Sequence, residues 1–228
     1  MTAPLYGIFG CGGFGREGIE LARETCLREH GSDAKFELCF IEHRPAATFV
    51  DGYPVLSIEQ FAQIRDRQRY FNILIANSDD RVKIAKECET LGLTPFTIRS
   101  RTAEVHATAT IGEGAVLCQY SLVSANARVG RFFHLNHHSY VSHDCTVGDF
   151  VTFAPAVRCN GTVQIEDFAY LGSGAVIRNG MPGRHMRIGR RAIIGMGAIV
   201  VKPVPEGVTV VGNPARPLAR PRAPRALE

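Results

Sequence analysis

The middle of the chain carries an apolar residue at every sixth position from residue 105 to residue 177, and this period constrains the fold more than any other feature. The recurring residues are Val105, Ile111, Leu117, Val123, Val129, Leu135, Val141, Val147, Phe153, Cys159, Ile165, Leu171 and Ile177. The pattern breaks over Gly183–Arg187 and resumes at Ile188. A period of six belongs neither to an α-helix nor to an alternating strand, and it is typical of a parallel β-solenoid. So long a run argues against chance alternation in a β-sandwich.

Composition and charge limit the cellular compartment and the classes of partner that we expect for the protein. No apolar run reaches membrane-spanning length, and no signal peptide opens the sequence, so we expect no membrane partner. The seven cysteines are scattered without a CxxC pair, which predicts free thiols in a cytoplasmic protein. The net charge is only +4, and the basic, proline-rich tail lacks interleaved aromatic residues, which argues against nucleic acid as a partner.

The first hundred residues follow a different pattern from the repeats. Apolar strands are expected at Leu5–Phe9, Phe36–Ile41 and Phe71–Ala76, and helices near 15–29 and Asp79–Leu91. This β-α-β order predicts a parallel sheet with helices on its faces. We therefore expect an α/β domain over residues 1–101, a β-helix over 102–218 and a basic tail over 219–228.

A glycine-rich loop joins the first expected strand to the first expected helix. Gly10-Cys11-Gly12-Gly13-Phe14-Gly15 fits G-x-G-x-x-G in the context that nucleotide phosphates require, where backbone N–H groups open a helix. A complete dinucleotide fold needs two mononucleotide halves, and this domain has length for only one. The loop therefore predicts a single nucleotide, such as a sugar nucleotide, with Glu42 near the ribose or the base.

The hexapeptide period resembles that of the left-handed β-helix acyltransferases. The whole chain is similar to the bacterial sugar-nucleotide N-acetyltransferases of this superfamily, a subgroup that includes sialic acid O-acetyltransferase-like proteins. The resemblance implies a half-Rossmann domain followed by a left-handed parallel β-helix, acetyl-CoA as co-substrate, no metal, and a homotrimer with acyl-CoA sites between neighbouring chains. It also implies a UDP-linked amino sugar as the commonest acceptor, with GDP or dTDP as alternatives.

The resemblance assigns substrate-binding residues in the first domain. These are Gly12, Gly13, Phe14, Glu42, Arg44, Asn77 and Arg81. Phe14 stands where the family usually has a histidine, and Glu42-His43-Arg44 stands where it usually has paired aspartates. Both departures affect which nucleobase the first domain would recognise and how it would bind the sugar.

The segment from Asn136 to Phe150 carries the most specific motif. The family pattern of an asparagine followed after six residues by His-Asp/Glu-Cys matches Asn136, His143 and Asp144. An aminosugar is largely protonated at neutral pH, and a histidine is suited to accept its proton as the free amine attacks a thioester. Asp144 would orient the ring, Asn136 would fix the ring or the acceptor, and by the resemblance the Gly161 N–H would stabilise the oxyanion.

Other residues are assigned to acetyl-CoA by resemblance alone. Backbone groups of Gly161, Ser173 and Met196 would bind pantetheine, and Pro214 would lie near the adenine. The expected activity is N-acetylation of a nucleotide-linked amino sugar, and the expected sugar is a 4-amino-4,6-dideoxyhexose.

Three alternatives stay open at this point. The same fold would support O-acetylation of a sugar hydroxyl, and a solenoid also serves as a docking surface in a non-catalytic partner protein. A zinc hydratase of the β-helical kind has two histidines five residues apart, as in His138 and His143. The third histidine of such a site would lie 36 residues earlier, whereas His106 lies 32 residues before His138.

Overall fold

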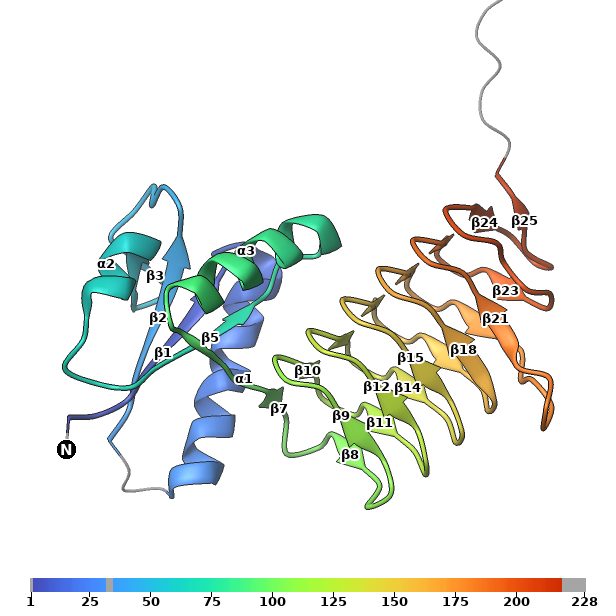
Figure 1. Cartoon of the computed structure of the whole chain (residues 1–228), viewed down its shortest axis with the longest axis horizontal. Helices are drawn as coiled ribbons and strands as arrows, with labels where there is room; N and C mark the ends of the chain where they lie inside the picture. Colours follow the sequence, from blue (N-terminus) through green and yellow to red (C-terminus); the bar gives the residue numbers. More distant parts are fainter. Residues whose placement is uncertain (1, 32–34, 219–228) are drawn as a thin grey trace, which may run out of the picture.

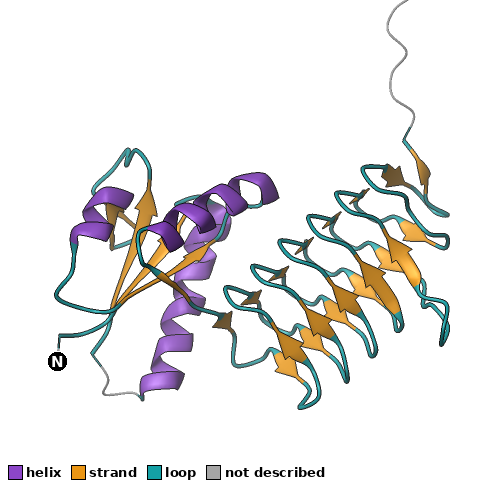
Figure 2. Cartoon of the chain, viewed as in Figure 1, coloured by secondary structure: helices purple, strands orange, loops and turns teal. Residues whose placement is uncertain are grey.

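A computed structural model describes residues 2–31 and 35–218, so the predicted tail at 219–228 lies outside the described residues. The chain forms an α/β domain set beside one end of a long β-helix (Figure 1). All helices of the described part lie in the first domain (Figure 2). The predicted fold class, an α/β domain followed by a parallel β-helix, is confirmed.

The first domain is a three-layer α/β unit. Its strands and helices are β1 (Leu5–Phe9), α1 (Gly13–His30), β2 (Glu37–Glu42), β3 (Phe49–Val50), β4 (Tyr53–Ser57), α2 (Ile58–Gln63), β5 (Arg69–Ile73), α3 (Ser78–Thr90) and β6 (Thr94–Pro95). The sheet order is β3-β4-β2-β1-β5-β6, with every pairing parallel except that between β3 and β4. The β3–β4 hairpin was not predicted from the sequence, because β3 has only two residues and Pro54 interrupts the strand pattern of β4.

Each face of this sheet has its own apolar core. α1 packs one side through Ile19 and Ala22, which lie against Ile8 of β1 and Phe40 of β2. α2 and α3 cover the other side with buried residues that include Ile58, Phe61, Ile84, Ala85 and Cys88. The parallel sheet is buried on both faces, as the near-continuous apolar β1 and β2 predict.

The second domain is the left-handed parallel β-helix that the hexapeptide period predicts. Its strands are β7 (Ile98–Arg99), β8 (Glu104–Val105), β9 (Thr110–Ile111), β10 (Val116–Leu117), β11 (Leu122–Val123), β12 (Arg128–Val129), β13 (His134–Leu135), β14 (Tyr140–Val141), β15 (Thr146–Val147), β16 (Thr152–Phe153), β17 (Arg158–Cys159), β18 (Val163–Ile165), β19 (Tyr170–Leu171), β20 (Val176–Ile177), β21 (Met186–Ile188), β22 (Ile193–Ile194), β23 (Ile199–Val200), β24 (Thr209–Val211) and β25 (Arg216–Pro217). β7 already pairs with β10, so the first coil begins at Ile98, a few residues before residue 102.

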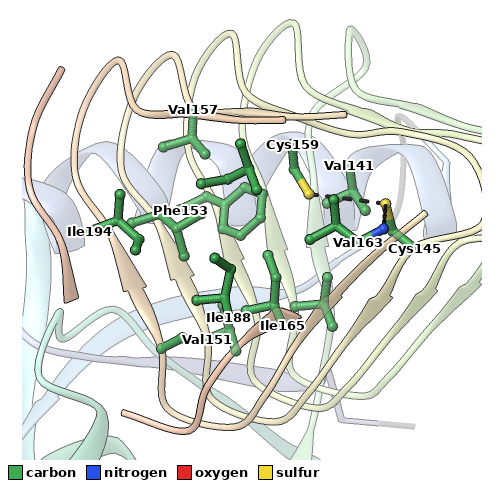
Figure 3. Close-up of a cluster of buried hydrophobic side chains, with 14 of the residues drawn as sticks. Val141, Cys145, Val151, Phe153, Val157, Cys159, Val163, Ile165, Ile188 and Ile194 are labelled. Carbon is green, nitrogen blue, oxygen red and sulfur yellow. Dashed lines mark hydrogen bonds between the residues drawn. The ribbon is translucent and has the colours of Figure 1, made fainter. Parts of the chain in front are cut away.

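Successive strands build three flat faces around one core. The first face holds β7, β10, β13, β16, β19, β22, β24 and β25, the second runs from β8 to β23, and the third runs from β9 to β21. The residues of the six-residue period point inward, and Leu135, Val141, Phe153 and Ile165 are all essentially inaccessible. Figure 3 shows this core with Cys145 and Cys159 inside it. The described cysteines are free, in agreement with their predicted packing role.

Three edges separate the faces, and each has its own chemistry. The histidine edge comprises residues 124–127, 142–145 and 160–163, between the second and third faces. The pocket edge comprises residues 118–121, 136–139, 154–157 and 172–175, between the first and second faces. The phenylalanine edge comprises residues 112–115, 130–133, 148–151 and 166–169, between the third and first faces.

The phenylalanine edge attaches the two domains. Phe132, Phe150 and Phe168 occupy equivalent corner positions with positive φ, and their rings stack with centroids 5.2 and 5.8 Å apart. Phe132 and Phe150 share a buried cluster with side chains of α3. The first domain is therefore fixed against the first face of the β-helix, which determines what its glycine loop can reach.

In the described part of the chain, no helix combines the length and the apolar character needed to cross a membrane.

Candidate active site

The histidine edge holds a paired imidazole and carboxylate. His143 follows β14, and its Nδ1 lies 2.8 Å from Oδ2 of Asp144. Asn126, one coil earlier, donates from Nδ2 to the other carboxylate oxygen at 3.0 Å. These two hydrogen bonds, that from His143 first, hold the pKa of Asp144 below its usual value. Because the carboxylate accepts from Nδ1–H, the neutral ring keeps Nε2 as a free proton acceptor.

Gly161 lies directly beside that ring, one coil further along the same edge. A Cβ at Gly161 would come within 2.5 Å of His143 Cε1 and 2.6 Å of Nε2, so only glycine leaves room for the imidazole. Among the described residues, the Gly161 N–H donates no hydrogen bond. A backbone donor thus stands next to a potential base, so the structure brings together two of the residues that the sequence assigned to catalysis.

The glycine loop is built as an anion site. A Cβ at Gly15 would meet Gly10 O at 1.8 Å, so Gly15 permits the close approach of α1 to β1. Gly12 and Gly13 face open space, and Gly12 caps α1 without any side-chain hydrogen bond. The first N–H groups of an 18-residue helix therefore point at an open site that favours negative charge.

Glu42 orders this loop from the neighbouring strand. It ends β2, and its Oε1 accepts a hydrogen bond from the Cys11 N–H at 2.8 Å. Burial, with Glu42 nearby, raises the pKa of the Cys11 thiol to about 12, so that thiol is neutral at pH 7. Arg44 is exposed in the loop that follows β2.

A pocket of about 330 Å³ lies between the glycine loop and the β-helix. The first domain contributes Gly13, Phe14, Glu17 and Ala76, and the β-helix contributes His134, Asn136, Thr152, Ala154, Pro155, Tyr170 and Ser173. Its lining joins the amino end of α1 to the pocket edge, which is what a ligand with an anionic part and a sugar part would need.

Arg81 does not line this pocket, and its predicted substrate-binding role is corrected by the structure. Its side chain is inaccessible, and its guanidinium donates to the carbonyls of Ile75, Ala76 and Phe150 and to Oγ1 of Thr152, at 2.6–2.9 Å. Burial lowers its pKa to about 9. Arg81 is therefore a clamp between the two domains.

Asn77 also has a structural role. Its Oδ1 accepts from the backbone N–H groups of Asp79 and Asp80, at 2.9 and 3.2 Å, and so caps α3. The turn that the sequence assigned to substrate is thus the start of the helix that attaches the domains.

Asn136 is not brought to His143 within one chain. It follows β13 on the pocket edge, and its Nδ2 donates to the Phe153 carbonyl at 2.8 Å. A full face of the β-helix lies between Asn136 and His143. The structure therefore removes the ring-fixing role of Asn136 in a single chain and places Asn136 in the lining of the pocket between the domains.

The residues assigned to acetyl-CoA divide between the same two edges. Ser173 lies on the pocket edge, and its carbonyl accepts from the Gly197 N–H at 2.8 Å, next to Met196. Pro214 follows β24, which belongs to the first face, whereas Gly161 lies on the histidine edge. A single ligand could contact all four residues only if two edges came together.

The remaining histidines do not assemble with His143. His137 Nε2 lies 3.3 Å from Glu17, and the His138 ring stacks on Tyr120 at 5.1 Å. His138 and His143 lie on different edges, so within one chain the spacing that suggested zinc does not bring the two rings together. Within residues 2–31 and 35–218, no three His, Cys, Asp or Glu side chains are placed to hold a metal ion.

Known proteins resemble the chain over nearly its whole length. A GDP-perosamine N-acetyltransferase of Escherichia coli O157:H7 is 47% identical over 216 residues, which is 95% of this chain and 97% of that protein. No protein-family model matches the chain.

Solved structures share the same architecture. WeeI from Acinetobacter baumannii AYE has a TM-score of 0.88 and 42% identity, covering 95% of this chain and 100% of that one. The acetyltransferase domain of PglB from Neisseria gonorrhoeae FA1090, in complex with acetyl coenzyme A, has a TM-score of 0.83 and 27% identity, with coverage of 95% and 100%. Similarity of this extent and degree places the chain, an acyltransferase, in the sugar-nucleotide N-acetyltransferase family of the hexapeptide-repeat superfamily.

Proposed function

We propose that the protein transfers the acetyl group of acetyl-CoA to the amine of a GDP-linked 4-amino-4,6-dideoxyhexose, with GDP-perosamine as the first candidate. The observation that carries the proposal is the 47% identity, over almost the full length of both chains, to a GDP-perosamine N-acetyltransferase. Guanine thereby replaces uracil, the base that the sequence prediction ranked first. The proposal keeps acetyl-CoA as the donor, because a neighbour at 27% identity is described in complex with it.

His143 is the proposed general base. The amine nitrogen attacks the thioester carbonyl carbon while its proton passes to His143 Nε2, and the C–S bond then breaks. The departing thiolate of CoA takes a proton from the imidazolium, so the ring ends as it began. Asp144 stabilises the charged ring and fixes its orientation through the 2.8 Å contact with Nδ1.

The Gly161 N–H is the proposed oxyanion donor. It stands beside Nε2 and donates to no other group in the described residues, so it is available to the tetrahedral oxygen. In the first domain, the open N–H groups at Gly13 and Phe14 would bind the diphosphate, and the sugar would extend into the 330 Å³ pocket.

The division of the site between two edges supports a homotrimer with composite active sites. The pocket edge, with Asn136 and Ser173, and the histidine edge, with His143 and Gly161, lie on opposite sides of the second face, so a site built from two chains would unite them. Placing the pocket edge of one chain against the histidine edge of the next would bring Ser173 and Met196 opposite His143 and Gly161. We place this assembly in the cytoplasm, where the free cysteines would stay reduced.

Release of free thiol from acetyl-CoA tests the proposal. Purified protein would be given GDP-, UDP- and dTDP-linked 4-amino sugars, each with its 4-hydroxy analogue. We expect rapid thiol release with GDP-perosamine and none with its hydroxy analogue. Rapid release with a UDP or dTDP sugar would overturn the choice of base, and release with hydroxy analogues alone would favour O-acetylation.

A further inference from the structure

His134 is a buried side chain for which the proposed mechanism has no use. It lies on β13 with its ring fully inaccessible, and the Phe14 ring of the glycine loop meets it at 5.2 Å and 61°. It nevertheless belongs to the lining of the pocket between the domains. His134 therefore lies between the glycine loop, which is proposed to bind the diphosphate, and the pocket wall, which is proposed to bind the sugar.

One nitrogen of this ring has a fixed role. Nε2 lies 2.9 Å from the carbonyl oxygen of Ile73, which can only accept a hydrogen bond. Nε2 must therefore carry the proton and donate it. In the neutral ring the other nitrogen, Nδ1, is then an unprotonated acceptor.

The surroundings keep the ring neutral. Burial, and then the nearby guanidinium of Arg81, hold the pKa of His134 well below its usual value. Arg81 is itself fixed by four oxygen acceptors, so its charge cannot move away. His134 is thus unsuited to act as a base at neutral pH, and its tautomer is determined by Ile73.

Nδ1 is left without a partner. No atom of the described residues donates a hydrogen bond to it, although its neighbours Thr152 and Asn136 are bonded elsewhere. Buried polar atoms in native proteins are nearly always paired, so a donor from a ligand or an ordered water is expected here. The pocket below the glycine loop lies against this residue.

We propose that Nδ1 of His134 accepts a hydrogen bond from a hydroxyl group of the acceptor sugar, which makes His134 a positioning residue that selects the sugar. This inference rests on the proposed function, because it needs a nucleotide sugar in the pocket. A hydroxyl is the expected donor because the amine has to point away from this wall, toward His143 of the neighbouring chain. The Nδ1 atom adds a fixed, uncharged hydrogen-bond acceptor to a pocket that is also lined by Glu17, Tyr170 and Ser173.

Two substitutions separate the two ring nitrogens. In His134→Gln the side-chain amide can still donate to Ile73 O but offers no acceptor at the Nδ1 position. In His134→Asn an amide oxygen lies near the Nδ1 position, while the bond to Ile73 O is lost. A purely structural role predicts that His134→Asn is the more damaging change, whereas the proposed role predicts that His134→Gln is.

Steady-state kinetics provide the first readout. For His134→Gln we expect KM for GDP-perosamine to rise about tenfold, as the loss of one hydrogen bond predicts, with KM for acetyl-CoA and the Kd of GDP alone unchanged. For His134→Asn we expect a smaller rise. Equal KM values in His134→Gln and the wild type, or parallel weakening of GDP and GDP-perosamine, would overturn the inference.

Nitrogen NMR of the wild-type protein gives a readout that needs no variant. With ¹⁵N-labelled histidine, Nδ1 of His134 should resonate as an unprotonated nitrogen and move toward lower frequency when GDP-perosamine, but not GDP, is added. If the Nδ1 resonance does not shift when GDP-perosamine is added, the inference is overturned. Thiol release with GDP-perosamine would in that case still support the proposed function. Wild-type protein that releases no thiol with GDP-perosamine would instead count against the proposed function itself.

Discussion

The histidine edge and the pocket edge of the same β-helix differ in what they can do. On the histidine edge, the proposed base His143, its proposed orienting group Asp144 and the backbone N–H of Gly161 lie within a few ångströms of one another. On the pocket edge, Asn136 and Ser173 line a cavity that depends on the glycine loop of the other domain. One edge holds groups for proton transfer, and the other holds groups for binding.

The difference shows how a regular scaffold distributes an active site. Every coil repeats the same backbone, so the edges are equivalent until side chains and a docked domain distinguish them. Docking of the first domain against the first face places the pocket on one edge and leaves the other edge open to a second chain. Substitutions on the two edges should therefore have separable effects, on turnover and on substrate binding respectively.

The largest effect is expected for His143→Ala. Loss of the base should lower kcat by about 10²- to 10⁴-fold, because proton transfer contributes that much in comparable sites. The side chain is exposed, so the free energy of unfolding should change little. Thiol release under saturating substrates, beside a denaturant titration, measures both quantities. His137→Ala is the matched control on the other edge, and turnover retained in full by His143→Ala would refute the assigned base.

The next prediction tests whether the edges act in different chains. Gly13→Val should block the anion site without disturbing the fold, because a Cβ there meets no atom within 4 Å. Each variant alone should be nearly inactive, since one lacks the base and the other the binding site. After the two are unfolded together and reassembled in equal amounts, about a quarter of the composite sites should be intact.

A site formed within one chain predicts the opposite result for the mixed sample. If pocket and base act within one chain, every chain in the mixture carries a defect, and mixing should restore nothing. Mixing without reassembly, which keeps the original oligomers, is the control. A recovery that appears only after reassembly would support the composite site and the homotrimer together.

Arg81→Met should affect the pocket edge more than the histidine edge. Removing the guanidinium leaves the carbonyls of Ile75 and Phe150 without their donor, and we expect about 2 kcal/mol less stability because relief from burying the charge offsets part of the loss. KM for the nucleotide sugar should rise several-fold while kcat changes less. Lys83→Met, an exposed position on the same helix, is the control. A loss confined to kcat would contradict the role of Arg81 as a domain clamp.

Sequence reasoning predicted the regular part of the molecule and the local part of the site. The period identified the inward residues, and adjacency in the chain was enough to pair His143 with Asp144. The role of Arg81 depends on how the domains dock, which no repeat encodes. A signal was nevertheless present, because Arg81 shares one helical face with Ile84, Ala85 and Cys88, and a charged residue on a buried face requires partners.

The placement of Asn136 and His134 could not be predicted for a related reason. Both lie on or beside the first face, whose outward positions would be solvent-exposed in an isolated β-helix. The equivalent outward residues Val116 and Thr152 are also buried, whereas Arg128 on the third face is exposed. The first domain covers this part of the first face, and this burial is visible only in the structure.

The smallest effect is expected for Asp79→Asn at the far end of the docking surface. Asp79, at the start of α3, pairs with Arg191 beside the phenylalanine edge, and this contact holds its pKa below the ordinary 3.8. A lowered carboxyl pKa means that the pair stabilises the folded protein above the ordinary value and loses this contribution as the pH falls through the lowered one. Both groups are exposed, so Asp79→Asn should lower stability only slightly at pH 7, and the difference from wild type should vanish in acid. Denaturant titrations at several pH values measure this difference, with Asp80→Asn as the neighbouring control. A difference that persisted at the acid end would mean that Asp79 acts through contacts that do not depend on its charge, and the ion pair with Arg191 would then contribute nothing measurable to the attachment of the domains.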